Sequence, residues 1–201
     1  GKKVTAMLTN MNQPLGKYAG NSLEVFECVE ILKNSPIAKQ DKFFQETKEL
    51  SVHLAAQMLL LGGFAKNIND CLMAANRTIE DGSAYQKFTE LCQIHGGNLN
   101  SLPMPKNSVD ILAENSGYIS HMNTEKIGIA GIMLKAGRAQ TSDVIEPTAG
   151  IEFHVKLNSK IQVGDKLFTV YGADPSLFEA AAKELRNSIT TTLNPMNGLV
   201  T

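Results

Sequence analysis

The sequence lacks several features that would mark a common functional class. Its three cysteines, Cys28, Cys71 and Cys92, are widely separated, and no C-x-x-C pair occurs. This pattern excludes a disulfide framework and gives no sign of a zinc site. The apolar runs, such as that at 58–61, are far shorter than the roughly 20 residues of a membrane span. The chain also begins without the apolar stretch of a signal peptide, so we expect a cytoplasmic protein with reduced cysteines.

An excess of charge of one sign is also missing. The 201 residues contain 19 basic and 20 acidic side chains. This balance gives no electrostatic footprint for nucleic acid or a membrane surface, and we expect neither as a partner. The sequence contains no G-x-S-x-G, Walker, H-E-x-x-H or Rossmann glycine pattern, which excludes the enzyme classes that these motifs define.

The first half of the chain is predicted to be mostly helical. Val4–Thr9 is expected to form a buried strand, and a turn-rich loop at 10–21 follows it. Helices are then expected at 22–33, 41–61, 67–76 and 82–94. In the second of these, Leu50, Leu54, Met58 and Leu61 follow a helical spacing that predicts a buried stripe.

The composition of the chain changes at Leu102-Pro-Met-Pro105, which is predicted to be a linker. Short β-like runs separated by turn residues then predict a compact antiparallel or barrel-like domain. These runs are 108–113, 117–121, 128–134, 151–155 and 166–171, and a last helix is expected at 175–189. The fold class is therefore α/β, or α+β within this stretch, with domains at 1–101 and 102–201.

The segment Asn12–Glu27 is the most informative part of the chain. It is a loop shaped by Pro and Gly that enters a helix, with Asn21 at the N-cap and Glu24 three residues on, an Asn version of the capping box. Main-chain carbonyls near Leu15 and Tyr18 can converge with the Glu27 carboxylate, and these are the oxygen ligands that a hard cation prefers. Spacing alone favours the alternative, a shaped loop with Glu27 solvated or in a salt bridge.

This segment resembles the sequence Q-P-L-G-x-x-x-G-N-x-L-E-V of the pyrimidine-nucleoside and thymidine phosphorylases. The resemblance implies phosphorolysis of a pyrimidine nucleoside to the free base and a pentose 1-phosphate. It also implies a homodimer, inorganic phosphate as co-substrate, and a potassium ion. The potassium ligands that it assigns to this chain are the carbonyls of Leu15 and Tyr18 and the carboxylate of Glu27. Two further ligands belong to a preceding segment of the family.

A second match is Leu134–Ala139, which resembles the family's L-G-A-G-R. Lys135 replaces the first glycine, so the backbone there is not expected to need a positive φ. Arg138 is either an anion clamp or, as is more common for a lone arginine on such a loop, a structural salt bridge. The family places this motif in its C-terminal β domain, away from the substrate.

A third match extends from Asp143 to Leu167 and includes His154, in a stretch resembling the family's H-K-K-V-G-D. Asn158 replaces the glycine of that turn. Asparagine is the best substitute for a left-handed turn, so we expect the hairpin to be retained. His154 alternates with Ile151 and Phe153, which predicts a histidine on a strand face or satisfied in the core.

The family's phosphate loop, K-x-S-T-G-G-V-G-D, has no counterpart in this sequence. The glycine pairs Gly62-Gly63 and Gly96-Gly97 follow helices and do not precede them, as a phosphate cradle should. The resemblance thus covers nearly the whole chain but only the C-terminal half of the family's length. It assigns no catalytic or substrate-binding residue here, and the chain alone is expected to lack phosphorolysis activity.

Two alternatives remain open. One is a non-enzymatic carrier or scaffold module, because the hairpin at 155–170 also resembles biotinyl or lipoyl carriers. In a carrier, Lys135 in Met133-Leu-Lys135 would be the modified residue. The other alternative is a related phosphorylase that acts on nucleoside monophosphates. The sequence does not separate thymidine from uridine as the preferred substrate.

Overall fold

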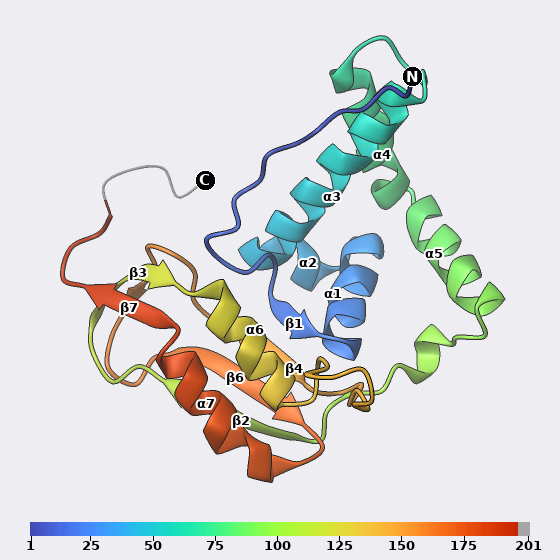
Figure 1. The fold of residues 1–201 in the computed structure, drawn as a ribbon. Helices are drawn as coiled ribbons and strands as arrows, with labels where there is room; N and C mark the ends of the chain where they lie inside the picture. The colour runs from blue at the N-terminus through green and yellow to red at the C-terminus, as the bar shows by residue number, and fades with distance from the viewer. Residues whose placement is uncertain (197–201) are drawn as a thin grey trace. The chain divides into compact units, whose positions relative to one another are not determined.

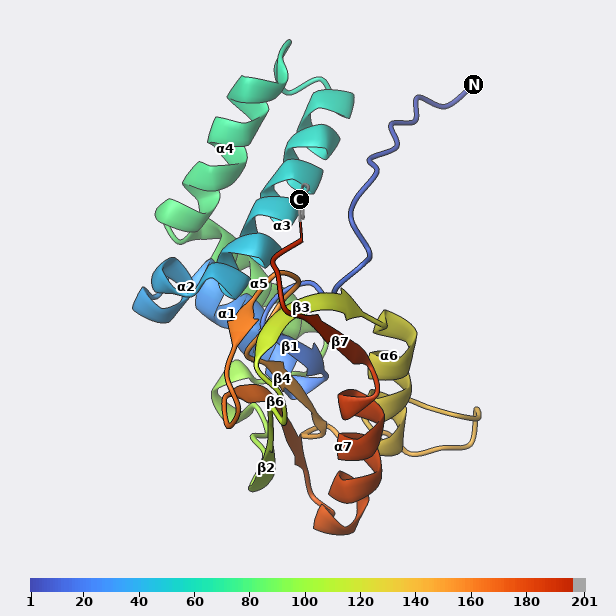
Figure 2. The ribbon, with the colours of Figure 1, turned by 90° about the vertical axis from the view of Figure 1, so that its left-hand side faces the viewer.

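A computed structural model describes residues 1–196 (Figures 1 and 2). The chain forms two compact units. The first consists of Gly1–Thr9 and Phe26–Leu102, and the second of Asn10–Val25 and the chain from Pro103 onward. Helices and antiparallel sheets are both present, which confirms the α+β class. Among the described helices, none has the length and apolar content to cross a membrane.

The first unit is helical. Asp41 caps one helix, its carboxylate accepting from the Phe43 amide at 2.9 Å, and Asn67 caps another through the Asp70 amide at 3.0 Å. Such polar caps satisfy amides that have no partner within the helix. The elements are α1 (Ser22–Leu32), of which the first residues belong to the second unit, α2 (Pro36–Gln40), α3 (Lys42–Leu61), α4 (Ile68–Glu80), α5 (Ser83–Ile94) and a 3₁₀ turn, η1 (Leu99–Ser101).

The predicted helices of this unit are present, but the predicted stripe on α3 is wrong. Its later buried residues are Val52 and Ala56, whereas Leu54, Met58 and Leu61 are exposed, Met58 by 67%. Val52 packs with Ala75 and Ile79 of α4. The two helices meet on the side of α3 that carries small and β-branched residues, because these permit a close approach. Leu59 also packs against this cluster, whereas Leu54 and Leu61 are exposed.

The predicted buried strand at Val4–Thr9 is also wrong. These residues have no regular structure and are exposed, Val4 by 83% and Leu8 by 98%. A strand needs a neighbour to satisfy its amides and carbonyls. Within residues 1–196, no strand pairs with this segment. Its apolar, β-branched composition is therefore not sufficient to order it.

The second unit contains two antiparallel sheets. A four-stranded sheet has the order β1-β4-β6-β2, and a three-stranded sheet has the order β5-β3-β7. Both are open, so a closed barrel is not confirmed. The strands are β1 (Tyr18–Gly20), β2 (Asn107–Leu112), β3 (Gly117–Met122), β4 (Gly150–Phe153), β5 (Lys160–Ile161), β6 (Lys166–Gly172) and β7 (Ile189–Thr192).

Two helices, α6 (Thr124–Met133) and α7 (Phe178–Arg186), lie side by side and cover one face of the larger sheet (Figures 1 and 2). A short turn, η2 (Pro175–Leu177), precedes α7. The core between these layers is continuous and apolar. From the sheet it takes Ile111, Ile151, Phe153, Phe168 and Val170, and from the helices Ile127, Ala130, Leu134, Phe178, Ala181 and Leu185.

The strand predicted at 128–134 is wrong, since residues 128–133 belong to helix α6 and Leu134 is its C-cap. Ile127, Ala130 and Leu134 are buried at helical spacing, and the Asn123 side chain accepts from the Lys126 amide at 3.0 Å to cap the helix. Packing on the sheet outweighs the low helix propensity of two glycines. The last helix ends at Arg186, and Ile189 begins a strand instead of completing a helical stripe.

Gly150 is the tightest point of the larger sheet, and Gly150→Ala tests that packing. A Cβ there would stand 2.6 Å from the Ala19 carbonyl oxygen and 2.8 Å from Leu23 Cδ1. We expect the substitution to lower the free energy of unfolding by about 1–3 kcal/mol, measured by urea denaturation. Gly128→Ala, in open space on α6, is the matched control and should raise it by ~0.5–1 kcal/mol. Equal effects of the two substitutions would contradict the predicted close approach.

Candidate functional site

The loop before β1, which is part of the second unit, is held to other residues of that unit by three hydrogen bonds, here called tethers. The Gln13 side-chain oxygen accepts from the Leu157 amide at 2.9 Å. The Pro14 carbonyl oxygen accepts from the ammonium of Lys156. The Lys17 carbonyl oxygen accepts from the Phe153 amide at 2.8 Å. These bonds lead the loop into β1, which pairs with β4.

The entry into α1 is also fixed by the second unit. Asn21 does not cap with its side chain, whose amide donates to the Ala136 carbonyl oxygen at 2.8 Å. Glu24 reaches back as predicted, but it accepts from the Gly20 amide at 2.8 Å, one residue before the cap. The Ser22 amide donates to the Pro147 carbonyl oxygen at 3.0 Å. Hydrogen bonds therefore join the start of α1 to two segments that are distant in the sequence, at Ala136 and Pro147.

The three predicted cation ligands are placed as follows. Leu15 lies in the loop with an exposed side chain, and Tyr18 begins β1 opposite Glu152. Both belong to the second unit. Glu27 belongs to the first unit, where it is 3% exposed and accepts from the Thr47 hydroxyl at 2.6 Å. Two carbonyls and a buried carboxylate are an all-oxygen donor set, which fits a hard monovalent cation and not a soft metal.

The outer face of the larger sheet carries a row of polar side chains. Tyr18, Glu152, Thr169 and Asp110 stand opposite one another across the four strands. The Thr169 hydroxyl donates to Asp110 at 2.7 Å. A hydrogen bond from Lys166, with the one from Thr169, holds the pKa of Asp110 below its usual value.

Glu152 is the acceptor at the other end of this row. It accepts from the Tyr171 hydroxyl at 2.6 Å, and Lys17 Nζ lies 3.7 Å from its other oxygen. Burial and the bond to Glu152 raise the pKa of Tyr171, so the phenol stays protonated and keeps donating. The row is a satisfied network of hydrogen bonds and not a set of groups prepared for proton transfer.

His154 is half-buried beside this row, directly after the last residue of β4. Its Nε2 lies 2.8 Å from the Thr169 hydroxyl oxygen, and because that hydroxyl donates to Asp110, the imidazole is the donor. Burial lowers the pKa of His154, against the opposing charge of Glu152. The sequence prediction was a histidine on a strand face or satisfied in the core. The imidazole has a hydrogen-bond partner, but the residue lies just outside β4 and is only half-buried.

Arg138 organises its own loop. Its Nε donates to the Asp143 carbonyl oxygen at 3.1 Å, and the Asp143 carboxylate accepts from the amides of Ala139 and Gln140. The Gln140 amide is the main cause of the lowered pKa of Asp143. These bonds close a short loop, so a structural role accounts for Arg138 without a bound anion.

The expectation that the backbone at Lys135 does not need a positive φ is wrong, because its φ is +65°. Its amide donates to Ile132 O at 2.9 Å and the Ala136 amide donates to Gly131 O at 2.9 Å. This pair of bonds is the Schellman motif that ends a helix, in which the left-handed residue is usually glycine. Lys135 therefore needs the conformation that the family's glycine adopts easily. It follows a helix, whereas a carrier lysine stands at an exposed β-turn.

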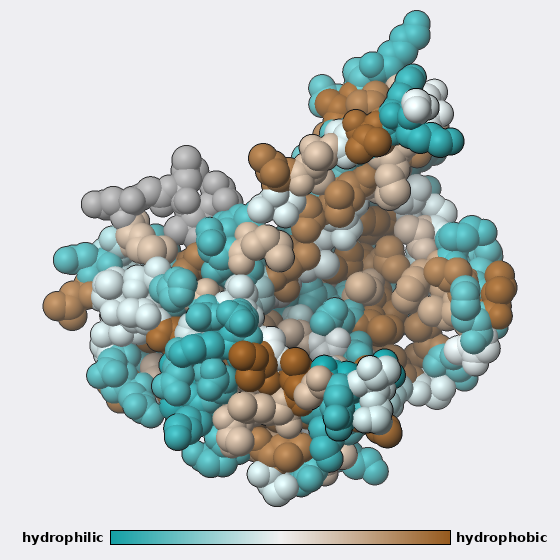
Figure 3. Space-filling view, in the orientation of Figure 1, coloured by the Kyte–Doolittle hydropathy of each residue, from teal (hydrophilic) through white to brown (hydrophobic). Residues whose placement is uncertain are grey.

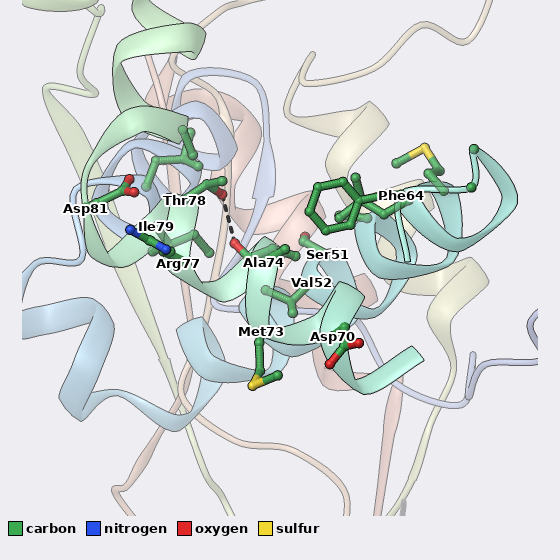
Figure 4. A pocket seen from close by; sticks show the side chains of 18 residues that line it. Ser51, Val52, Phe64, Asp70, Met73, Ala74, Arg77, Thr78, Ile79 and Asp81 are labelled. Atoms are coloured by element: carbon green, nitrogen blue, oxygen red, sulfur yellow. Dashed lines mark hydrogen bonds between the residues drawn. The ribbon is translucent and has the colours of Figure 1, made fainter. Parts of the chain in front are cut away.

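An apolar groove of about 1180 Å³ lies on α3 and α4 of the helical unit (Figures 3 and 4). Its lining includes the exposed side chains of Met58, Phe64 and Met73. The Thr78 hydroxyl there donates to the carbonyl of its own helix, at Ala75, at 2.8 Å (Figure 4). The groove offers mainly apolar contact, and Asp70, Arg77 and Asp81 are also among its lining residues.

The fold and the anchored loop define an α+β chain with a helical unit and a β-rich C-terminal unit. Residues 118–192 match the family model of the pyrimidine nucleoside phosphorylase C-terminal domain. The chain is 29% identical to the pyrimidine-nucleoside phosphorylase of Bacillus subtilis over 193 residues, 93% of this chain and 43% of the relative. A Staphylococcus aureus enzyme of that name is also 29% identical, over 196 residues. The resemblance to this family is thus confirmed, and the chain spans less than half the length of these relatives.

Sequence reasoning missed two residues of this site. Lys156 and Glu152 were not singled out, although Lys156 occupies the second lysine position of the H-K-K pattern. Lys156 is 4% exposed. Its burial depends on the loop around Pro14, which is distant in sequence, so no local pattern reveals it. Glu152 could have been found from the alternation of β4, which points it away from Ile151 and Phe153.

Lys135→Gly tests the strain at the end of α6. Glycine adopts a positive φ without a Cβ clash, so we expect the free energy of unfolding to rise by about 1 kcal/mol, measured by urea denaturation. Lys183→Gly, at an exposed position of α7, is the matched control and should lower it by ~1 kcal/mol. A loss of stability in both variants would show that Lys135 is not strained.

His154→Gln tests the buried imidazole. Because the folded-state pKa is below the unfolded value, the His154 contribution to stability is complete above about pH 6.5 and is lost as the pH falls below it. Glutamine keeps a donor for Thr169 but does not titrate. Between about pH 7 and pH 5 we therefore expect the variant to lose less stability than the parent, measured by urea denaturation at each pH. His121→Gln, exposed on β3, should follow the parent. Parallel pH curves for all three proteins would count against this assignment.

Proposed function

We propose that this chain is part of a pyrimidine-nucleoside phosphorylase of the thymidine type. The reaction is a pentosyl transfer, in which phosphate attacks C1′ of a pyrimidine nucleoside and the products are the free base and a (deoxy)ribose 1-phosphate. The observation that carries the proposal is the similarity to relatives of that name over 93% of the chain, across both compact units. Pyrimidine nucleoside and inorganic phosphate are the proposed substrates of the whole enzyme, a cytoplasmic homodimer.

In this proposal the chain supplies support and not the reacting groups. The sequence lacks a glycine-rich loop with Lys and Ser that could bind phosphate before a helix. Residues 1–101 would complete the nucleoside-binding α/β domain, and 102–201 would form the β-rich C-terminal domain. Thymidine and uridine are equally compatible with these residues, and so is a nucleoside monophosphate.

We further propose that Leu15, Tyr18 and Glu27 contribute to a potassium site through two main-chain carbonyls and one carboxylate. Support comes from the all-oxygen donor set and from the burial of Glu27. When bound, a monovalent cation would neutralise the buried carboxylate and hold the loop carbonyls together. The side chains of Leu15 and Tyr18 are not ligands, so their identity matters less than the path of the backbone.

A hybrid enzyme tests the proposed function. The C-terminal part of the Bacillus subtilis relative that this chain matches would be replaced by residues 1–201 of this chain, and release of thymine or uracil would be followed with phosphate present. We expect turnover from the hybrid, since the relative supplies the missing part. The isolated chain should give no turnover above background, because it has no phosphate loop.

The unmodified Bacillus subtilis enzyme is the positive control, and circular dichroism establishes that the hybrid is folded. A folded hybrid without turnover would count against the proposed function. Turnover by the isolated chain would show that the catalytic machinery lies within these 201 residues, contrary to the proposal.

A further inference from the structure

We propose that Lys156 is a positioning residue whose buried ammonium holds the loop at 13–18 in place before any ion binds. The inference deepens the proposed cation site and rests on it for its functional meaning. Lys156 is 4% exposed, and its ammonium donates to the Pro14 carbonyl oxygen. The ammonium also lies 5.8 Å from the centre of the Phe153 ring, within cation–π range.

The base of the Lys156 side chain is itself rigid. Its amide donates to the Ser159 hydroxyl at 2.9 Å, and the Ser159 amide donates back to the Lys156 carbonyl oxygen at 3.0 Å. Asn158 takes a positive φ of 63° in this turn, as the sequence predicted, and its amide donates to Ile119 O at 2.7 Å. A side chain that starts from a fixed turn loses little further entropy when its head group is also fixed.

The three tethers of the loop differ in kind. Those from the Leu157 and Phe153 amides come from backbone whose path the hairpin sets. The tether to Pro14 is the one of the three whose donor is a side chain, and the tether at Gln13 has a side-chain acceptor. A substitution of Lys156 therefore removes the Pro14 tether and leaves the other two donors in place. Leu15 and Gly16 lie between the tethers at Pro14 and Lys17, and Gly16 makes the turn with a φ of +71°. The Leu15 carbonyl therefore depends on both flanking tethers.

A buried ammonium is costly unless hydrogen bonds compensate it, and an ammonium bonded to a carbonyl makes a stronger bond than a neutral donor does. The ammonium of Lys156 thus places a permanent positive charge next to a carbonyl oxygen of this loop. The ammonium donates to the Pro14 carbonyl oxygen, whereas the loop carbonyls among the proposed ion ligands belong to Leu15 and Tyr18. The loop would be formed in advance, so that ion binding costs little further ordering.

Amide hydrogen exchange of the 201-residue chain in potassium-free buffer tests this inference. In Lys156→Met, we expect exchange at residues 15–18 to speed up about tenfold or more, while strands β4 and β6 keep their protection. Lys160→Met is the matched control, because Lys160 is exposed on the same hairpin. Lys156→Arg keeps the charge and should retain part of the protection. Unchanged exchange at 15–18 in Lys156→Met would overturn the proposal. So would a loss of protection spread evenly over the whole unit.

A second measurement separates this inference from the proposed cation site. The melting temperature is followed with increasing KCl against choline chloride at equal ionic strength, for the parent, Glu27→Gln and Lys156→Met. A rise in the parent that both variants reduce supports the two proposals together. If KCl does not raise the melting temperature of the parent, the proposed cation site is wrong. If amide exchange at residues 15–18 is still faster in Lys156→Met, the positioning role of Lys156 is supported on its own. A rise that Lys156→Met reproduces in full would overturn the role of Lys156.

Discussion

The pairing of β1 with β4 is the constraint on which the candidate site depends. Tyr18 to Gly20 lie against Gly150 to Glu152 in antiparallel register, although they are far apart in the chain. The pairing requires two glycines to face each other, because a Cβ on either would come within 2.6 Å of a carbonyl oxygen of the facing strand. It brings the loop at 12–21 into the C-terminal unit.

The two faces of the larger sheet have different roles that follow from strand alternation. The inner face is apolar and packs on α6 and α7, which supplies most of the stability of the unit. The outer face places Glu152, Thr169 and Asp110 in a row of hydrogen bonds. Because each acceptor in this row has a donor, the row specifies register and does not offer reactive groups.

The sequence predicted local structure well where caps and turns determine it. The helices after Asp41 and Asn67 and the left-handed turn at Asn158 follow from side chains that act within a few residues. It failed where tertiary packing decides. Residues 128–134 were predicted to be a strand because they are apolar, yet the sheet beneath them selects the helical spacing of Ala130 and Leu134. Lys135 was predicted to avoid a positive φ, but the end of that helix imposes one.

The candidate site shows the same division between local and distant causes. Leu15, Tyr18 and Glu27 came from a resemblance in a continuous stretch, which a sequence displays directly. Lys156 became apparent only in three dimensions, because its acceptor at Pro14 is remote in the chain. Main-chain carbonyl ligands depend on the backbone path and not on side-chain identity, so residues that fix the path determine such a site as much as its ligands do. For this loop the path is set by a proline, a left-handed glycine and a buried lysine, and of these the lysine contributes a charge.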